Sequence, residues 1–256
     1  MSHRLGRCQS IEDVYIVGEL EPAKIFCSPA AELEAENLEI RADVGLAMER
    51  EFFDDQSFMI CYHNVQSLRA HFEDLMMQPD ILNCNIIGLG ETWLHPGENA
   101  ELPNFSAKFL NAGRGKGLAC YLKHGTSSEE TTEVIDENYT LLKMKLGSVI
   151  IILCYVSKEV VWSKFTKDVQ ILIGQSESPT LIIGDMNFDT EESNVFSKFM
   201  ASSKFDQLVK NPTHDRGSVL DHVYANQSVE ELEVSLKQKA VVYSDHDVIF
   251  VKLNLK

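Results

Sequence analysis

Short apolar runs alternate with polar turns along the chain from about residue 57 onward. In the run Leu181–Ile183, the β-branched content and the flanking Pro179 and Gly184 predict a buried strand, after which the chain turns on the glycine. Similar runs predict strands over residues 58–62, 81–89, 118–122, 141–146, 149–156, 219–224, 232–242 and 248–253. Helices are predicted over residues 69–77, 160–173 and 192–203. This order predicts an α/β fold, a four-layer sandwich of two packed mixed β-sheets flanked by helices.

The first 56 residues have a different pattern from the rest of the chain. Residues 30–51 are rich in Ala, Glu and Leu, and Leu33, Leu38 and Leu46 recur at rough helical spacing. We therefore expect an acidic, partly helical or mobile segment over residues 1–56 and a main domain over residues 57–256. The segment carries no motif for catalysis, and its simplest interpretation is a solvated linker or the remnant of a larger upstream protein.

The composition is typical of a globular protein. Hydrophobic residues make up 44% of the 256 positions, and no apolar run approaches the ~20 residues that span a bilayer. The N-terminus lacks the charged-then-apolar pattern of a secretory signal. We therefore expect an intracellular protein, nuclear or cytoplasmic, that is neither secreted nor inserted in a membrane. The six cysteines form no C-x-x-C pair, which argues against a zinc site or a disulfide framework.

The formal net charge of −16 argues against a broad basic face and against non-specific nucleic-acid binding. Acidic residues also gather at metal-dependent phosphoesterase sites, so the charge does not exclude a phosphodiester substrate. If the substrate is anionic, a divalent cation must offset the local repulsion.

Polar side chains suited to chemistry lie at the ends of predicted strands, and one lies inside a strand. In chain order they are Asn64, Glu91, Tyr155, Asp185, Asn187, Asp221, Asp245 and His246. Asp185 and Asn187 stand two residues apart, so extended backbone would direct both side chains outward on the same side. Each residue also has an ordinary interpretation, because Asp and Asn are common in turns and a lone Tyr is common in a core. The recurrence of polar strand ends favours a functional site.

In their order and spacing, these positions resemble the endonuclease/exonuclease/phosphatase superfamily, which has the fold of DNase I. The resemblance rests on the segments HNVQSL, GETWL, CYV, GDMN, LDHV and SDH, and it covers roughly residues 57–256. The GETWL segment and the stretch from NPTH to VLDHV are most similar to the apurinic-type endonuclease domains of non-LTR retrotransposons and Helitron-type elements. By this resemblance, the chain is a fragment, a solo copy or a domesticated descendant of such an element.

The resemblance implies a hydrolase that uses Mg²⁺ or Mn²⁺ to nick DNA and to leave a 3′-hydroxyl. Glu91 is the implied metal ligand, and Asn64 and Asp245 complete or orient the metal shell. His246, oriented by Asp221, is implied to act as the general base or to bind the phosphate as an imidazolium.

Three further polar residues are implied to act on the attacking water and on the phosphate. Asp185 positions or deprotonates the water, so the choice of base between Asp185 and His246 stays open. Asn187, together with Asn64, donates hydrogen bonds to developing oxyanion charge, and Tyr155 donates to the phosphate or to the leaving oxygen.

The sequence also departs from the pattern of these relatives. Gln66 stands where many apurinic-type members carry an acid, so we expect one metal ion and not two. The basic side chains that could contact DNA are few: Arg69, Arg114, Lys116 and Arg216. Thr213 either contacts a phosphate or stabilises a turn.

Two other functions fit the same residues. A phosphatase or phosphodiesterase of this fold could act on a lipid, an inositol or a small nucleotide, which suits the acidic composition. A catalytically silent interaction domain is the second alternative, and the acidic N-terminal segment would then be the functional part. The sequence does not indicate which proteins bind the chain, which DNA sites it prefers or which oligomeric state it adopts.

Overall fold

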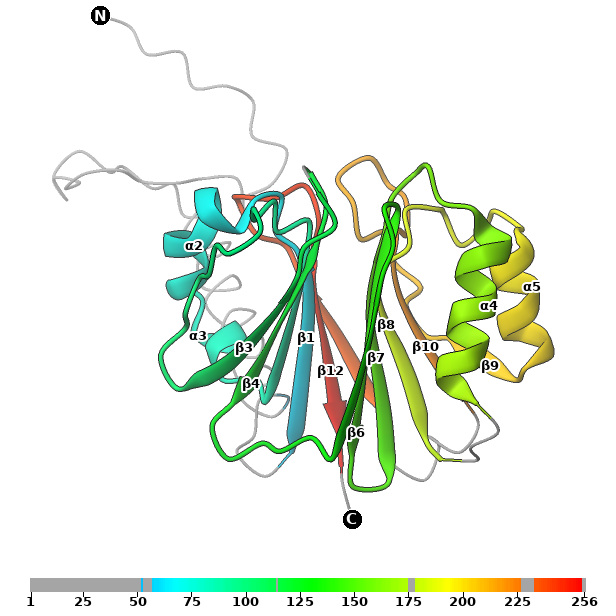
Figure 1. The fold of residues 1–256 in the computed structure, drawn as a ribbon, viewed down its shortest axis with the longest axis horizontal. Helices are drawn as coiled ribbons and strands as arrows, with labels where there is room; N and C mark the ends of the chain where they lie inside the picture. Colours follow the sequence, from blue (N-terminus) through cyan, green and yellow to red (C-terminus); the bar gives the residue numbers. More distant parts are fainter. Residues whose placement is uncertain (1–51, 53–56, 114, 175–177, 227–232, 255–256) are drawn as a thin grey trace, which may run out of the picture. The chain divides into compact units, whose positions relative to one another are not determined.

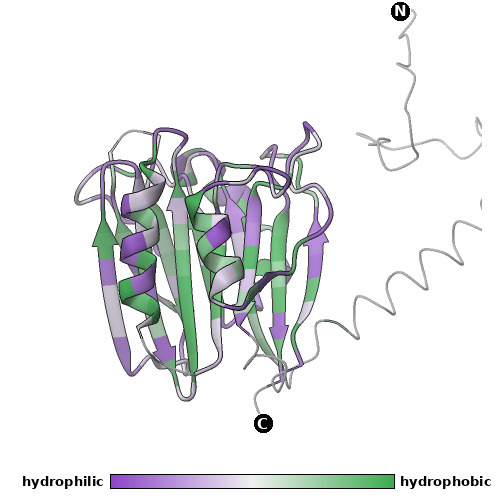
Figure 2. Ribbon diagram, turned by 90° about the vertical axis from the view of Figure 1, so that its right-hand side faces the viewer, coloured by the Kyte–Doolittle hydropathy of each residue, from purple (hydrophilic) through white to green (hydrophobic). Residues whose placement is uncertain are grey.

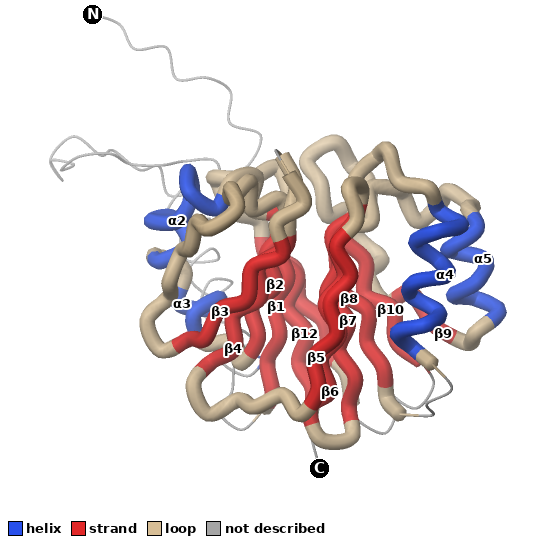
Figure 3. The backbone as a smooth tube through the Cα atoms, in the orientation of Figure 1, coloured by secondary structure: helices blue, strands red, loops and turns tan. Residues whose placement is uncertain are grey.

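The structure, a computed structural model, describes residue 52 and residues 57–113, 115–174, 178–226 and 233–254. Two six-stranded sheets pack face to face here, and helices lie on their outer sides (Figure 1, Figure 3). The predicted fold, two packed mixed sheets flanked by helices, is therefore confirmed. Apart from Phe52, the predicted N-terminal segment over residues 1–56 lies outside the described residues, so its boundary stays a prediction.

The first sheet has the strand order β11-β12-β1-β2-β4-β3. Its strands are β1 (Phe58–Asn64), β2 (Ile86–Gly90), β3 (Phe105–Leu110), β4 (Leu118–Lys123), β11 (Ser235–Lys239) and β12 (Val248–Leu253). Only β1 and β2 are parallel neighbours among these described strands. Because a parallel pair needs a crossover, helices α2 (Leu68–Met76) and α3 (Pro79–Leu82) connect them on the outer face of the sheet.

The second sheet has the strand order β5-β6-β7-β8-β10-β9. Its strands are β5 (Glu130–Ile135), β6 (Tyr139–Leu146), β7 (Val149–Val156), β8 (Thr180–Asp185), β9 (Phe205–Gln207) and β10 (Asp221–Asn226). Here β7 and β8 are the parallel pair, and helix α4 (Trp162–Ile173) makes their crossover. Helix α5 (Val195–Ser202) lies beside α4 on the same outer face (Figure 1).

The continuous apolar runs of the sequence are strands buried on both faces. All eight residues of β7 are buried. Ile151 and Leu153 belong to the core between the two sheets, whereas Ile152 and Cys154 belong to the core under the helices. In Figure 2 the helices that face the viewer are mixed in hydropathy, while the central strands are largely hydrophobic. Among the described residues, none of the helices has the length and apolar character that spanning a membrane requires.

Two sequence predictions about these elements were wrong. The strand predicted over residues 81–89 begins as helix α3, because Pro79 occupies the first turn of a helix, and only Ile86–Gly90 forms a strand. Gly184 lies inside β8 and makes no turn. A Cβ at this position would come within 2.0 Å of the Cys154 carbonyl oxygen, so the glycine permits the close approach of β7 and β8.

Strands β3, β5 and β9 were not predicted. β5 lies at a sheet edge and alternates between exposed and half-exposed residues, without an apolar run. β9 contains only three residues. Edge strands with solvated side chains give a weak hydrophobic pattern, and this accounts for the omission.

The topology brings several strand ends to one edge of the sandwich. In the first sheet Asn64, the last residue of β1, pairs with Gly90, the last residue of β2. In the second sheet Asp185, the last residue of β8, pairs with Tyr155 on one side and with Asp221 on the other. Because β10 and β12 run antiparallel to β8 and β1, their beginnings lie at the same edge.

Candidate active site

Asp185 is the most enclosed carboxylate at this edge. Its side chain has no exposed surface. Its Oδ2 accepts a hydrogen bond from Asn64 Nδ2 at 2.9 Å, and this bond joins the two sheets. Its Oδ1 accepts from the backbone N–H of Asn187 at 2.8 Å, while Asn187 Nδ2 lies 3.4 Å from Oδ2 and donates to the Val156 carbonyl at 2.9 Å. The carboxylate is therefore held on both oxygens.

The expectation that Asp185 and Asn187 project outward from extended backbone was wrong. Asp185 points into the sandwich, and Asn187 has a φ of 51°, in the left-handed region. The two side chains meet because the chain turns between them, and the turn closes with the Asn187 N–H on the Asp185 carboxylate.

Asp221 and His246 form a buried pair beside Asp185. His246 Nδ1 lies 2.8 Å from Asp221 Oδ2, and both side chains are almost fully buried. Thr213 Oγ1 accepts the backbone N–H groups of Leu220 and Asp221 at 3.0 Å each, so its contacts here are those of a turn-stabilising residue. With Nδ1 bound to the carboxylate, Nε2 of His246 is the ring nitrogen left for a ligand.

The charges of this cluster are strongly perturbed. Burial alone would lower the pKa of His246, but the charge and the hydrogen bond of Asp221 raise it to about 9. Burial, followed by repulsion from Asp221, raises the pKa of Asp185 to about 8. Two carboxylates opposite each other on adjacent strands repel, and a cation or a retained proton relieves the repulsion. A pKa of about 9 favours the imidazolium form of His246 at neutral pH in the metal-free protein.

Glu91 follows β2 and reaches across to the second sheet. Tyr155 donates its hydroxyl to Glu91 Oε1 at 3.4 Å, and Trp93 donates its indole N–H to Glu91 Oε2 at 3.3 Å. Both bonds are long, so neither saturates the carboxylate. Burial, with further contributions from the Glu91 and Asp185 carboxylates, raises the pKa of Tyr155, which keeps its hydroxyl a donor.

Two residues that the sequence analysis did not select complete this edge. His214 Nε2 lies 3.3 Å from Asp245 Oδ2, and His214 Nδ1 accepts the backbone N–H of Arg216 at 3.0 Å. This pattern places the ring proton of His214 on Nε2, facing the carboxylate. Ser244 donates its hydroxyl to the Asn64 carbonyl at 2.7 Å and accepts the His246 N–H at 3.1 Å. The available signals were the quoted segments themselves, since His214 is the last residue of NPTH and Ser244 is the first of SDH.

A cavity of about 340 Å³ opens over these groups. Its walls include six residues of the cluster: Glu91, Tyr155, Asn187, His214, Asp245 and His246. Asn64, Asp185 and Asp221 lie behind this surface, because they are almost fully buried and do not line the cavity. The predicted positions therefore divide into a buried layer and a layer that a ligand can touch.

The loops around the cavity hold unusual backbone conformations. Among the non-glycine residues with positive φ in the described ranges, five follow β1, β2 or β8 at this edge: Gln66, Ser67, Glu91, Trp93 and Asn187. Such conformations cost free energy in side-chain-bearing residues. Their concentration beside one cavity marks the loops as positioned for function.

The donor atoms suit a hard divalent cation. Glu91 offers partly exposed carboxylate oxygens, and Asp245 Oδ1 is buried without a hydrogen-bond partner among the described residues. Asn64 is different, since its amide already donates to Asp185 and accepts from the Gln66 N–H, so its present contacts orient Asp185. Within the described ranges, the groups of three close ligand atoms are His214–Asp245–His246 and Asp185–Asp221–His246, and neither includes Glu91.

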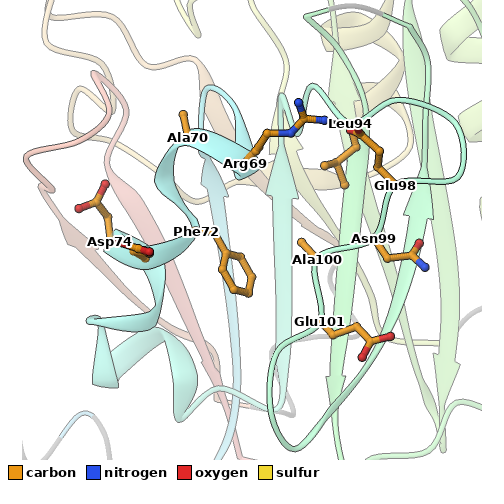
Figure 4. Close-up of a pocket in the computed structure, with 10 residues that line it drawn as sticks. Arg69, Ala70, Phe72, Asp74, Leu94, Glu98, Asn99, Ala100 and Glu101 are labelled. Atoms are coloured by element: carbon orange, nitrogen blue, oxygen red, sulfur yellow. Dashed lines mark hydrogen bonds and ion pairs between the residues drawn. The ribbon is translucent and has the colours of Figure 1, made fainter.

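The predicted basic residues are only partly at the cavity. Lys116 and Arg216 line it, but Lys116 Nζ also donates to the Glu137 carbonyl and to Asn138 Oδ1. Arg114 lies outside the described residues. Arg69 lines a different and larger cavity of about 940 Å³, where its guanidinium points toward Glu98 and pairs with it (Figure 4).

The comparisons with known proteins bear on the family and the fold of the chain. The model of the "Endonuclease/Exonuclease/phosphatase family" matches residues 61–246. An AP endonuclease from Archaeoglobus fulgidus is 16% identical, with a TM-score of 0.59 over 77% of this chain and 100% of that chain. The endonuclease domain of TRAS1, a telomere-specific non-LTR retrotransposon, is 14% identical, with a TM-score of 0.59 over 78% of this chain and 99% of that chain.

A third similar structure is a variant of the 3′ phosphatase NExo from Neisseria, bound to a product DNA hairpin. It is 11% identical, with a TM-score of 0.58 over 77% of this chain and 100% of that chain. At these identities the structural likeness establishes the fold alone. The comparison with curated proteins gave no match.

Proposed function

Because the chain belongs to the endonuclease/exonuclease/phosphatase family, as its sequence motifs predict, we propose that it is a metal-dependent phosphodiesterase that nicks DNA and leaves a 3′-hydroxyl. The observation that carries the proposal is the Asp221–His246 pair, 2.8 Å apart, beneath a cavity that Glu91 and Tyr155 also line. Hydrolysis of a phosphodiester needs phosphate binding, an activated water and compensation of charge at the phosphorus. The cavity offers groups for each requirement.

The binding of the phosphate is assigned to three donors. His246, with its pKa raised to about 9, presents Nε2 as a charged donor at neutral pH. Asn187 and Tyr155 line the same cavity, and they would contribute an amide and a hydroxyl by exchanging their long bonds to Asp185 and Glu91, 3.4 Å each, for the phosphate. Donors that are fixed before the substrate arrives stabilise developing negative charge without reorganisation.

The acceptance of the proton from the attacking water is assigned to Asp185. His246 is a poor candidate for the base, because it already holds a proton at neutral pH. With its pKa raised to about 8, Asp185 also holds a proton at neutral pH in the metal-free protein, so its role as acceptor requires that a bound cation lower this pKa. Asn64 and Asn187 hold its carboxylate in place behind the cavity wall, and the assignment requires that a water enter past Asn187 or His246, which line that wall.

The cation site is assigned to Glu91 and Asp245, because both carboxylate residues line the cavity. Asn64, the other predicted ligand, is assigned the orientation of Asp185. A bound Mg²⁺ or Mn²⁺ would supply Lewis-acid stabilisation of the phosphate oxygens and would neutralise part of the local negative charge. His214 and Trp93 then fix the orientation of the two carboxylates.

DNA as the substrate and an origin in a retrotransposon rest on the relatives. The motifs GETWL and NPTH to VLDHV are similar to those of element-encoded endonucleases, and a retrotransposon endonuclease domain and an AP endonuclease are among the similar structures. These likenesses support the choice of DNA over a lipid or inositol phosphate.

The test is a nicking assay on supercoiled plasmid with Mg²⁺. The native protein converts the plasmid to open circles, EDTA stops the reaction, and DNA polymerase extends the nicks without prior phosphatase treatment. Asp185→Asn abolishes nicking, while Asp206→Asn, an exposed acid on β9, retains it. Equal nicking by the native protein and Asp185→Asn contradicts the proposal. Release of phosphate from lipid, inositol or nucleotide substrates without any nicking assigns the site to the alternative function.

A further inference from the structure

Trp93 is exposed and contacts Glu91 and Lys116, two residues that line the cavity. Its exposed fraction is 45%, and among the large hydrophobic side chains that are exposed in the described part of the chain it is the one aromatic. It belongs to none of the hydrophobic core clusters of the described residues. Packing therefore does not explain its position.

The structure holds Trp93 in place from several directions. Its backbone N–H donates to the Lys116 carbonyl at 3.2 Å, and its φ is 54°, which costs free energy for a side chain of this size. Its indole N–H donates to Glu91 Oε2 at 3.3 Å. The polar edge of the ring thus points to the cavity, one carboxylate away from Tyr155, while the rest of the ring remains partly open to solvent.

Gly115, which has no side chain, lies next to the indole N–H of Trp93. It lines the cavity and has a φ of 74°, and a Cβ built on it would come only 4.0 Å from Trp93 Nε1. Gly115 itself therefore places no side chain between the indole N–H and the cavity that this glycine lines.

Because the cavity is lined by both basic and acidic side chains, an uncharged contact such as ring stacking would add affinity for a nucleic acid. The lining contains basic side chains from Lys116, Lys158 and Arg216, and acidic ones from Glu91, Glu159 and Asp245. These six charges cancel, so apart from His246 and a bound cation the cavity offers little electrostatic attraction for a polyanion, in a chain with a net charge of −16. Stacking on an aromatic ring supplies affinity for a nucleobase without charge and without regard to sequence.

We propose that Trp93 is a stacking platform for the nucleobase of a nucleotide next to the phosphate bound in the cavity. This inference rests on the proposed function, because it requires a nucleic acid in the cavity. The side chain would serve two purposes at once: its N–H orients Glu91, and its ring face binds the base. A nucleobase in single-stranded or locally opened DNA is the ligand, since a paired and stacked base hides its face.

Fluorescence tests the contact directly, because Trp93 and Trp162 are the two tryptophans of the chain and Trp162 packs among Phe165, Phe188 and Phe196. A Trp162→Phe, Asp185→Asn protein reports on Trp93 alone and is blocked in cleavage. A single-stranded oligodeoxynucleotide of roughly ten nucleotides quenches its emission, and a fully abasic strand of the same length does not. Equal quenching by the two strands, or none by either, overturns the inference.

Substitutions separate the two contacts of the side chain. In the Asp185→Asn background, Trp93→Ala raises the Kd for the oligonucleotide about tenfold, whereas Trp93→Phe, which keeps a ring but loses the N–H, stays within roughly threefold. Met77→Ala, at an exposed apolar position after α2, leaves the Kd unchanged. Equal weakening by Trp93→Ala and Trp93→Phe assigns the effect to Glu91 and overturns stacking.

The failure of the inference is distinguishable from the failure of the proposed function. Plasmid nicking by the native protein, together with an unchanged Kd in Trp93→Ala, overturns stacking and leaves the nuclease proposal intact. Base-dependent quenching without any nicking supports stacking and contradicts the nuclease. An emission shift of Trp93 with phosphatidylserine vesicles, and none with the oligonucleotide, identifies a lipid-facing residue and overturns the inference.

Discussion

Two buried histidines on either side of strand β10 have pKa values that are shifted in opposite directions. His246 pairs with Asp221, and its pKa rises to about 9. His222, the residue after Asp221, points to the opposite face, where burial lowers its pKa to about 4. Its Nε2 faces the carbonyls of Phe188 and Val219 at 3.1 and 2.9 Å.

The difference shows what a carboxylate adds to burial. Both rings are removed from water, and burial by itself favours the neutral imidazole. A neutral ring that donates to carbonyls holds a core together, as His222 does. A ring beside Asp221 keeps its proton and offers a charged donor to the cavity, as His246 does. One carboxylate thus separates a structural histidine from a candidate for phosphate binding.

Among these histidines, removal of His246 should have the largest effect on nicking. His246→Ala deletes the charged donor and leaves the Asp221 carboxylate buried without its partner, so we expect the nicking rate to fall about a thousandfold. The rate of conversion of supercoiled plasmid measures the loss. His124→Ala, an exposed histidine after β4, is the control and should nick at the native rate. Near-native nicking by His246→Ala would exclude the assigned role.

Removal of the charge that faces His246, which would leave its ring neutral as His222 is, should lower the nicking rate less than removal of His246 itself. Asp221→Asn keeps the shape of the pair but removes the charge, so we expect the nicking rate at pH 7 to fall about a hundredfold while the protein stays folded. Circular dichroism verifies the fold, and Asp206→Asn serves as the charge-matched control. A native rate in Asp221→Asn would show that the charge of the ring does not matter.

The third histidine, His214, should affect the Mg²⁺ concentration that nicking requires. It faces Asp245 Oδ2 at 3.3 Å, as a ring that orients a metal-binding carboxylate does. We expect His214→Ala to raise the Mg²⁺ concentration for half-maximal nicking about tenfold, with a smaller change in the rate at saturating Mg²⁺. A fall in the saturated rate with an unchanged Mg²⁺ requirement would place His214 outside the cation site.

His222 should affect the free energy of unfolding and not the nicking reaction. Its folded-state pKa, about 4, lies below the ordinary value of about 6.5. As the pH falls below about 6.5, the unfolded chain takes up a proton that the folded protein refuses, so stability is lost until about pH 4. At pH 5 this contribution of His222 is about 2 kcal/mol, measured as the difference between the native protein and His222→Gln in urea unfolding at pH 7.5 and pH 5. The same pH dependence in His222→Gln would assign the loss to other groups.

The sequence predicted the parts of this account that local pattern determines. Continuous apolar runs gave the central strands, such as Val149–Val156, and polar groups at their ends gave the members of the site. The strand order that collects them could be inferred only through the family resemblance, since no local signal states that β1 and β8 meet through Asn64 and Asp185.

Features that depend on tertiary contacts escaped the sequence analysis. Asp185 was expected to face outward, because the strand pattern does not reveal that Asn64 of the other sheet covers it. His214 and Trp93 are candidates for the site because they contact the carboxylates of Asp245 and Glu91. These contacts are seen only in the folded chain. Edge strand β5 was missed because its side chains are solvated.

The most direct test of the central claim is the titration of His246 by ¹H–¹⁵N NMR in the metal-free protein, followed in the native chain and in Asp221→Asn. The account predicts that native His246 stays an imidazolium until about pH 9, and that Asp221→Asn makes it neutral at pH 7. A neutral His246 at pH 7 in the native protein would contradict the account.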